Sequence, residues 1–460
     1  MHDYDCGDMT TVDHLDGSWS RRRWMAAAAG VTGLAGAEDM ALSFSPAASG
    51  LKRSGRPRSE GPRSRMKIGS FEATLVASPD YALLNSWNVH DTHFQRAILE
   101  LETTDGYTGV AEIGGAAFQA LQAARDTVLG RDPFEIEFFR RSLSHRSEFA
   151  PRHNAETLAA VEIACLDLIG KVIDRPVVDL IGGPFRDEAP FSAYNFFVLP
   201  EKGGPDVTTP EAMAQQFLDF HRDHGFTTCK FKGGVLKPEL EIEALTRIRE
   251  AMPQARLRID PNASWSVETS VRAARRLEPL GMEYLEDPTR GQDGMAEVRR
   301  QTSIPLATNM CVTRMEHIRP GYDRGAIDIV LLDPHYMGGL NNVRHWASTC
   351  EALGWGCSGH SNNYLGISMA TQVHMVCAIS HITYDVDSHY PWTTQDIIRG
   401  GMLRFRDGKM ALPPGPGLGV EIDPDKKALL AENVSRTRAR HDLLHQWDPG
   451  YPKDRHGVRW

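Results

Sequence analysis

The chain has 460 residues, a formal net charge of -9 at pH 7, and a composition that is 41% hydrophobic and 24% charged. This composition is typical of a soluble globular protein, and the length exceeds that of one ordinary domain. The acidic balance argues against nucleic acid as a partner. Seven scattered cysteines without a C-x-x-C motif exclude a disulfide framework and a cysteine-based zinc site.

The N-terminal region has the pattern of an export signal followed by a linker. Arg21, Arg22 and Arg23 precede a short apolar run that ends in the candidate cleavage site Ala35-Gly36-Ala37, which resembles a twin-arginine signal. The run is too short to span a membrane, so no membrane partner is expected. Residues 51–65 are basic and rich in Gly, Pro and Ser, as in a flexible linker. We expect residues 1–65 to direct export to the periplasm or beyond; the alternative is a disordered tail on a cytoplasmic protein.

Residues 66–190 have the pattern of an α+β module in which strands precede helices. Alternation predicts strands at about 66–76, 94–102 and 107–112, the last two joined by a turn that contains Asp105-Gly106. A polar loop at 85–91 follows the first strand. Residues 155–171 have apolar positions at helical spacing and predict a helix.

From residue 191 onward a strand-then-helix unit recurs about every 25 residues, the spacing that a β/α barrel requires. The predicted helices include 238–252 and 266–280, and the predicted strands are 229–232, 257–260, 284–286, 305–309, 327–333, 356–360 and 383–387. A doubly wound open sheet would also alternate in this way, but no glycine-rich phosphate loop follows a first strand. We therefore predict a TIM-like barrel over 191–412. The segment 413–460 is too polar for another barrel unit.

Ionisable or amide side chains follow every one of these strands. In a β/α barrel the catalytic residues lie at the carboxyl ends of the strands. An unbroken run of such residues is difficult to explain by packing. The residues are Lys230, Lys232, Asp260, Glu286, Asn309, Asp333, His360 and His389.

Three of these residues suit a magnesium site. Asp260, Glu286 and Asn309 supply hard oxygen ligands from three neighbouring strands, and Mg²⁺ takes few protein ligands of this kind. Each residue alone could be a turn former or a helix cap, but the three together indicate a metal. Asn262 could simply cap the following helix.

His360 has the surroundings of a general base. Small residues precede it, and Asp333 on the preceding strand could accept its Nδ1–H and raise the basicity of the ring. Lys230 and Lys232 lie on one face of their strand. Alone, the pair is compatible with a strand on the protein surface. Because oxygen ligands are expected at the ends of the next three strands, we interpret both ammonium groups as part of the site.

In this order of residues the chain resembles the enolase superfamily, and specifically its glucarate dehydratase subgroup. The resemblance covers nearly everything after residue 66. Its most specific matches are Lys230-Phe231-Lys232-Gly233-Gly234-Val235, Pro305-Leu306-Ala307-Thr308-Asn309-Met310, Asp333-Pro334-His335 and His360-Ser361-Asn362-Asn363. Asn309 favours the glucarate dehydratase subgroup within the superfamily, because most members of the superfamily have Glu or Asp at this position.

The resemblance implies a modified (β/α)7β barrel at 191–412 and an α+β capping domain formed by 66–190 and 413–460. It implies substrate contacts that the strand pattern alone does not predict: Asn85, His90, Tyr194, Lys230, Asn309, His360, Ser361, Asn362, His389 and either Arg440 or Arg438. It also implies a Mg²⁺-dependent dehydratase of a sugar diacid, with Lys232 and His360 as bases. We expect a homo-oligomer whose only other partner is the small-molecule substrate.

The mechanism requires the two lysines to differ. Lys230 should remain charged to hold the substrate carboxylate, whereas Lys232 must be neutral to remove a proton. We expect Lys230 and the metal to lower the pKa of Lys232.

Three alternatives remain open. The first is a dehydratase or epimerase that acts on another sugar acid, since the segment 143–154 and the residues Trp87 and Asp91 depart from the glucarate pattern. The second is a sugar-acid-binding protein without turnover. The third is a Schiff-base aldolase, which would need one lysine in an apolar pocket but no cluster of oxygen ligands.

Overall fold

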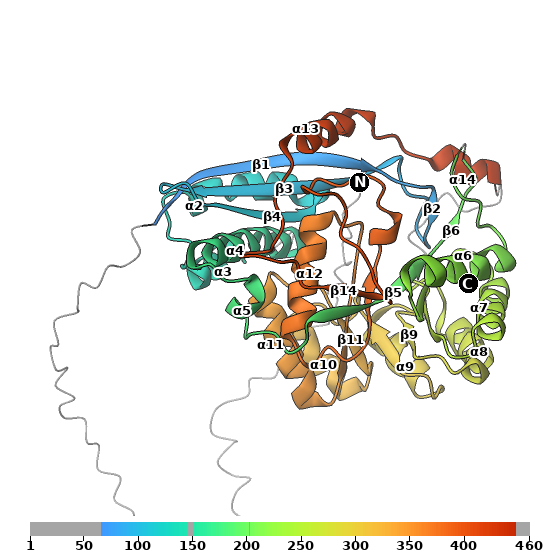
Figure 1. Ribbon diagram of the computed structural model, residues 1–460. Helices are drawn as coiled ribbons and strands as arrows, with labels where there is room; N and C mark the ends of the chain where they lie inside the picture. The colour runs from blue at the N-terminus through green and yellow to red at the C-terminus, as the bar shows by residue number, and fades with distance from the viewer. Residues whose placement is uncertain (1–65, 145–150, 202, 448–460) are drawn as a thin grey trace, which may run out of the picture. The chain divides into compact units, whose positions relative to one another are not determined.

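The computed structural model describes residues 66–144, 151–201 and 203–447, and Figure 1 shows their arrangement. The export signal and linker expected at 1–65 lie outside these ranges. Within them, no helix combines the length and the apolar character needed to cross a membrane.

The first part of the chain forms an antiparallel sheet covered by helices. The sheet has the order β1-β3-β4. Helix α4 packs so closely on β4 that a Cβ at Gly109 would lie 2.1 Å from the carbonyl oxygen of Ala164, and a glycine is needed there. The elements of this part are β1 (Ile68–Pro79), β3 (His93–Thr103), β4 (Thr108–Gly114), α1 (Phe118–Ala123), α2 (Arg125–Val128), α3 (Ile136–Leu143), α4 (Pro151–Ile173) and α5 (Val177–Leu180).

Eight parallel strands form a nearly closed barrel, in the order β12-β11-β10-β9-β8-β7-β5-β13. A parallel bridge between Cys357 and Ile382 brings the two ends of this sheet together. The strands are β5 (Glu188–Asn195), β7 (Thr228–Lys232), β8 (Arg256–Asp260), β9 (Tyr284–Glu286), β10 (Leu306–Thr308), β11 (Ile329–Leu332), β12 (Gly356–Gly359) and β13 (Val386–Ser388). The predicted TIM-like barrel with an α+β cap is confirmed.

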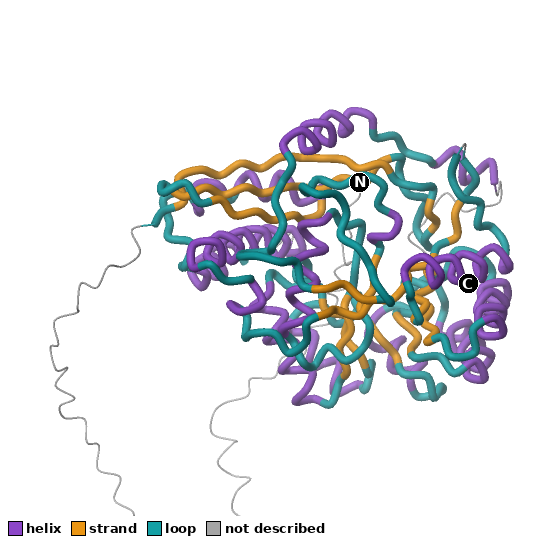
Figure 2. Tube along the Cα trace, viewed as in Figure 1, coloured by secondary structure: helices purple, strands orange, loops and turns teal. Residues whose placement is uncertain are grey.

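A helix connects each barrel strand to the next, which is the (β/α)7β arrangement, and Figure 2 shows helices around the strands. These helices are α6 (Pro210–His224), α7 (Pro238–Ala251), α8 (Val267–Leu277), α9 (Gly291–Arg299), α10 (Met315–Arg324), α11 (Leu340–Leu353) and α12 (Gly366–Ala378). Ser266 caps α8 by accepting the Thr269 N–H, so the alternative that Asn262 caps this helix is wrong.

The C-terminal segment returns to the first strand of the chain. Helix α13 (Pro424–Asn433) lies along β1 (Figure 1), where Lys427 forms ion pairs with Glu72 and Glu100. Strand β14 (Lys409–Ala411) pairs with β5, and α14 (His441–Trp447) follows α13. The short strands β2 (Leu83–Leu84) and β6 (Phe197–Val198) pair with each other. This pairing fixes the loop at 85–91 close to the end of β5.

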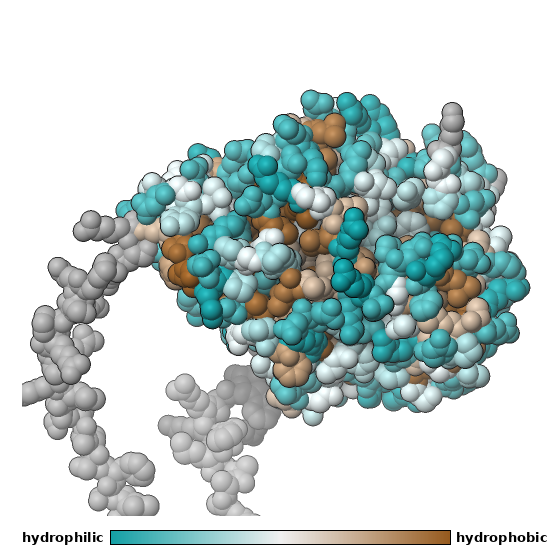
Figure 3. Space-filling view, in the orientation of Figure 1, coloured by the Kyte–Doolittle hydropathy of each residue, from teal (hydrophilic) through white to brown (hydrophobic). Residues whose placement is uncertain are grey.

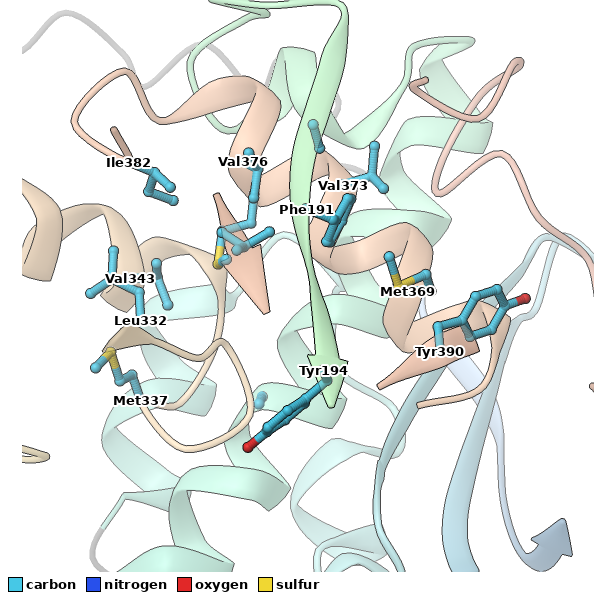
Figure 4. Close-up of a cluster of buried hydrophobic side chains, with 14 of the residues drawn as sticks. Phe191, Tyr194, Leu332, Met337, Val343, Met369, Val373, Val376, Ile382 and Tyr390 are labelled. Atoms are coloured by element: carbon cyan, nitrogen blue, oxygen red, sulfur yellow. The ribbon is translucent and has the colours of Figure 1, made fainter. Parts of the chain in front are cut away.

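Helix α12 is buried on nearly all sides, as expected of a helix enclosed by other elements. Its Met369, Val373 and Val376 gather with Phe191 of β5 in the apolar cluster of Figure 4. The face of the molecule seen in Figure 3 is mostly hydrophilic, with small apolar patches. The core therefore lies between α12, the barrel and the capping sheet.

One buried carboxyl in this core should make stability depend on pH. Glu162 of α4 accepts the backbone N–H of Asn341 at 2.9 Å. Burial raises its pKa from the ordinary 4.5 to about 7. Between pH 4.5 and about 7 the folded state thus retains this proton, whereas the unfolded chain loses it. The contribution of Glu162 to the free energy of unfolding is complete below the unfolded pKa and disappears as the pH rises through 7.

Replacing Glu162 by Gln should remove this pH dependence. The free energy of unfolding of the variant, relative to wild type, should rise by about 3 kcal/mol between pH 4.5 and pH 8. Melting temperatures measured by calorimetry across this range test the prediction. Parallel curves for the two proteins would contradict it.

Candidate active site

Lys230 is fully buried inside the barrel. Its ammonium group donates to Glu286 Oε2 at 2.5 Å and to Asp387 Oδ2 at 2.6 Å. Burial alone would lower the pKa of Lys230, but the two carboxylates outweigh it and raise the pKa well above its ordinary value. Lys230 is therefore charged, as the sequence predicted.

Lys232 points to the same interior, two residues further along β7. It donates to Asp260 Oδ2 at 2.7 Å and to the Tyr194 hydroxyl at 3.0 Å. Burial and Lys230 both lower the pKa of Lys232, but Asp260 and Tyr194 raise it further, so that it lies above its ordinary value. Lys230 thus lowers the pKa of Lys232 as expected, but Asp260, which directs its carboxylate at the lysine, outweighs that effect.

The predicted oxygen ligands meet at the same end of the barrel. Asp260 and Glu286 end β8 and β9, and Asn309 follows β10. Two of their oxygens, Glu286 Oε1 and Asn309 Oδ1, are buried and have no hydrogen-bond partner among the described residues. Unsatisfied buried oxygens are costly. A hard cation would satisfy both, so this donor set fits Mg²⁺.

The backbone around these oxygens is held in the left-handed region. Asn262, Ala263 and Asp287 have φ values of 50°, 57° and 36°, which non-glycine residues rarely adopt. Asp287 accepts Thr308 Oγ1 at 2.5 Å and the backbone N–H of Asn309 at 2.9 Å. It therefore fixes the turn that carries the third oxygen ligand.

Asp333 and His360 form the predicted pair. His360 Nδ1 lies 2.8 Å from Asp333 Oδ2, which leaves Nε2 as the basic nitrogen. Burial would raise the pKa of Asp333, but hydrogen bonds from His335 and His360 keep it well below its ordinary range. Tyr364 also donates to this carboxylate, at 3.2 Å. The histidine is held by a charged, well-satisfied carboxylate.

The residues of the expected substrate loop lie near the site but differ in their contacts. Asn85 uses its side-chain oxygen to accept the N–H groups of Trp87 and Asn88 within its own loop. His90 lies 2.9 Å from Asp80 and stacks on His389, with ring centroids 5.7 Å apart. Neither ring nitrogen of His389 has a hydrogen-bond partner among the described residues, and burial lowers its pKa to about 3. Neutral His389 is thus available to a ligand.

Residues that follow β12 contact the same region. Asn362 donates to the Tyr336 hydroxyl at 2.9 Å, and the Tyr336 ring lies 5.2 Å from that of His360. Ser361 donates to the carbonyl of Asn362. Both sequence-predicted residues therefore lie beside His360.

The two C-terminal arginines differ in their contacts. The Arg438 side chain donates to carbonyls of its own segment. Arg440 is 8% exposed at its side chain and pairs with Glu201 through Nε (2.9 Å) and Nη2 (2.5 Å). It also donates to the carbonyls of Asp80, His90 and Asp91. These contacts use all five donors of a guanidinium.

Two functional groups were missed from the sequence. Asp387 shares Lys230 with Glu286, and Tyr336 covers His360. The position of Asp387 in the last predicted strand was a usable signal, because that strand must close the barrel next to the lysines. Tyr336 had no such signal, because its contact depends on a loop.

Comparisons with known proteins match both parts of the chain. Residues 212–426 match the family described as enolase C-terminal domain-like, and residues 85–182 match the mandelate racemase/muconate lactonizing enzyme N-terminal domain. A probable glucarate dehydratase from Streptomyces coelicolor is 38% identical over 402 residues, which cover 79% of this chain and 91% of that protein. The chain belongs to the enolase superfamily.

Other relatives of this superfamily member bear on its cofactor and its chemistry. The crystal structure of an enolase from Thermobispora bispora, complexed with magnesium and formate, is 39% identical. It has a TM-score of 0.79 and covers 86% of this chain and 100% of its own. Muconate cycloisomerase 1 from Rhodococcus opacus is 26% identical, covering 78% of this chain and 97% of that protein. The superfamily members similar to this chain therefore include both a probable dehydratase and a cycloisomerase.

Proposed function

We propose that this protein is a magnesium-dependent dehydratase of an acid sugar, with a glucarate-like diacid as substrate. One observation carries the proposal: Lys232 and the Asp333-held His360 occur together with two unsatisfied buried oxygens, on Glu286 and Asn309. Strands β7 and β12 are separated by β8–β11 on one side of the barrel and by β5 and β13 on the other. The two bases therefore extend from opposite walls.

The charges of the site suit removal of a proton next to a carboxylate. Asp260, Glu286 and Asn309 would hold Mg²⁺, which when bound supplies positive charge for the negative charge that develops on the substrate. The Lys230 ammonium faces the same carboxylate in a buried site, where such stabilisation is strong.

Each of the two proton transfers belongs to a residue on one wall of the barrel. Lys232 in its neutral form would take the α-proton, and His360 would give a proton to the departing β-hydroxyl, so that water leaves. The C–H electron pair forms the new double bond as the C–O bond breaks. The enol product then tautomerises to a keto-deoxy sugar diacid.

Three other functions are alternatives. An epimerase would use the same two bases and differ only in the fate of the substrate hydroxyl. A binding protein without turnover would not need both bases, yet Lys232 and His360 are present. A Schiff-base aldolase needs one lysine in an apolar pocket and has no use for oxygen ligands, whereas Lys232 lies among carboxylates, 2.7 Å from Asp260.

Incubation with a panel of sugar diacids and Mg²⁺ in D₂O should separate these functions. We expect a keto acid from at least one diacid, with deuterium at the former β-carbon, where the enol takes up a solvent deuteron as it tautomerises; mass spectrometry detects both. Exchange with inversion but without keto acid would indicate an epimerase. Binding of a diacid without exchange or keto acid would overturn the enzyme proposal; a sample with chelator in place of Mg²⁺ is the control.

A further inference from the structure

A cation would bind the far carboxylate of a sugar diacid well, but the C-terminal arginine that the family resemblance implies as a substrate contact is already paired. Arg440 donates all five of its N–H groups within the chain, to Glu201 and to three carbonyls of residues 80–91. Glu201 neutralises its charge. A substrate carboxylate could reach Arg440 only by displacing a bidentate ion pair, which is the strongest kind of arginine contact.

Other cations around the site are also paired with carboxylates of the chain. Lys230 and Lys232 contact Glu286 and Asp260 at 2.5 Å and 2.7 Å. Arg96, which lies over the Tyr364 ring, pairs with Glu112 at 2.6 Å. Lys230 and Lys232 serve the reacting end of the substrate, and Arg96 is buried with its carboxylate.

Arg152 differs from these cations. It lies in the first turn of α4, and its guanidinium carbon is 3.9 Å from the centre of the Tyr336 ring. Among the described residues, its nearest carboxylate contact, from Nε to Glu156 Oε1, is 3.7 Å long, beyond a direct hydrogen bond. The side chain is 57% exposed. Its charge is therefore held over an aromatic face, and no carboxylate in the described part of the chain forms a close ion pair with it.

The location of Arg152 suits the far end of a substrate. Tyr336, which supports it, lies at a tilt beside His360, with ring centroids 5.2 Å apart, and accepts a hydrogen bond from Asn362. The guanidinium is thus one aromatic ring away from the base that acts at the reacting carbon. A sugar chain extends its second carboxylate several carbon atoms beyond that carbon. Arg152 also lies in the segment 143–154, which departs from the glucarate pattern.

We infer that Arg152 binds the far carboxylate of a sugar diacid and so selects diacids over monoacids, whereas Arg440 is a positioning residue that fixes the loop at 80–91. This inference rests on the proposed function. Arginine suits the role because its planar donors match a carboxylate bidentately.

The test compares glucarate with gluconate and gulonate, each of which has a primary alcohol in place of one carboxylate. In Arg152→Met, kcat/KM for glucarate should fall about 10- to 100-fold more than for the better monoacid. Arg152→Lys should restore part of the preference. Arg440→Met should lower kcat/KM for the diacid and the monoacid alike. Arg140→Met, which changes an arginine paired with Glu137 on α3, is the matched control.

Two results would overturn the inference: an unchanged diacid preference in Arg152→Met, or loss of that preference in Arg440→Met. Calorimetric binding of the same acids in the presence of Mg²⁺ gives the ratio of the affinities for the diacid and the monoacid even without turnover. If wild type neither exchanges an α-proton nor forms a keto acid from any acid, the proposed function fails, while the ratio of the diacid and monoacid affinities still decides the role of Arg152.

Discussion

Replacing Lys232 by Ala should lower kcat for dehydration by about 10²- to 10⁴-fold, the range that a positioned general base contributes. The lysine is buried in the barrel beside Asp260 and Tyr194, and a water that filled the space left by the substitution would be a far weaker base. Deuterium exchange should be lost for the acid whose α-proton faces β7. The epimer at that carbon, whose proton faces His360, should still exchange.

Lys237→Ala is the matched control for this experiment. Lys237 is exposed and lies five residues further along the same segment, at the start of α7. Its replacement should leave both reactions unchanged. Full dehydration by Lys232→Ala would show that another group is the base.

Replacing Glu286 by Gln should remove the response to magnesium. The buried Oε1 of Glu286 has no hydrogen-bond partner among the described residues, and we expect the cation there. A ligand at 100 times its Kd stabilises the folded state by about 2.7 kcal/mol. Wild type should therefore melt at a higher temperature with Mg²⁺, whereas Glu286→Gln should not. Dehydration should fall with the loss of the cation.

Glu283→Gln provides the same substitution at the opposite end of the strand. Glu283 precedes β9 and pairs with Arg258 at 2.5 Å. Its replacement should change the melting temperature but not the increment that Mg²⁺ adds. An equal rise in melting temperature on addition of Mg²⁺ to Glu286→Gln and to wild type would show that the cation binds elsewhere.

The fold and the strand-end residues were predictable because both follow from local pattern. Hydrophobic strands recur at barrel spacing, and parallel strands bring their carboxyl ends together. Lys230, Asp260 and Glu286 therefore had to share one end of the barrel once the strands were identified. The bounds of the predicted strands shifted by only a few residues, as in β13, which was expected at 383–387 and lies at Val386–Ser388. The first barrel strand, β5, was missed.

Contacts between the cap and the barrel could not be predicted in this way. The pairing of Arg440 with Glu201 joins residues 239 positions apart, and no periodicity links them. The pKa of Lys232 could not be predicted either, because it depends on whether Asp260 faces the lysine or a cation. Both depend on side-chain positions, which pattern does not determine.

The contact of α13 with β1 has a consequence for synthesis on the ribosome. Lys427 and Glu72 are 355 positions apart, so β1 emerges on the order of tens of seconds before the helix that covers it. During that interval, one face of the nascent sheet is open to chaperones and proteases. Arg440, which donates to carbonyls of the loop at 80–91, is translated later still. A prematurely terminated chain could complete its barrel and yet lack these contacts, so we expect truncated products to be inactive.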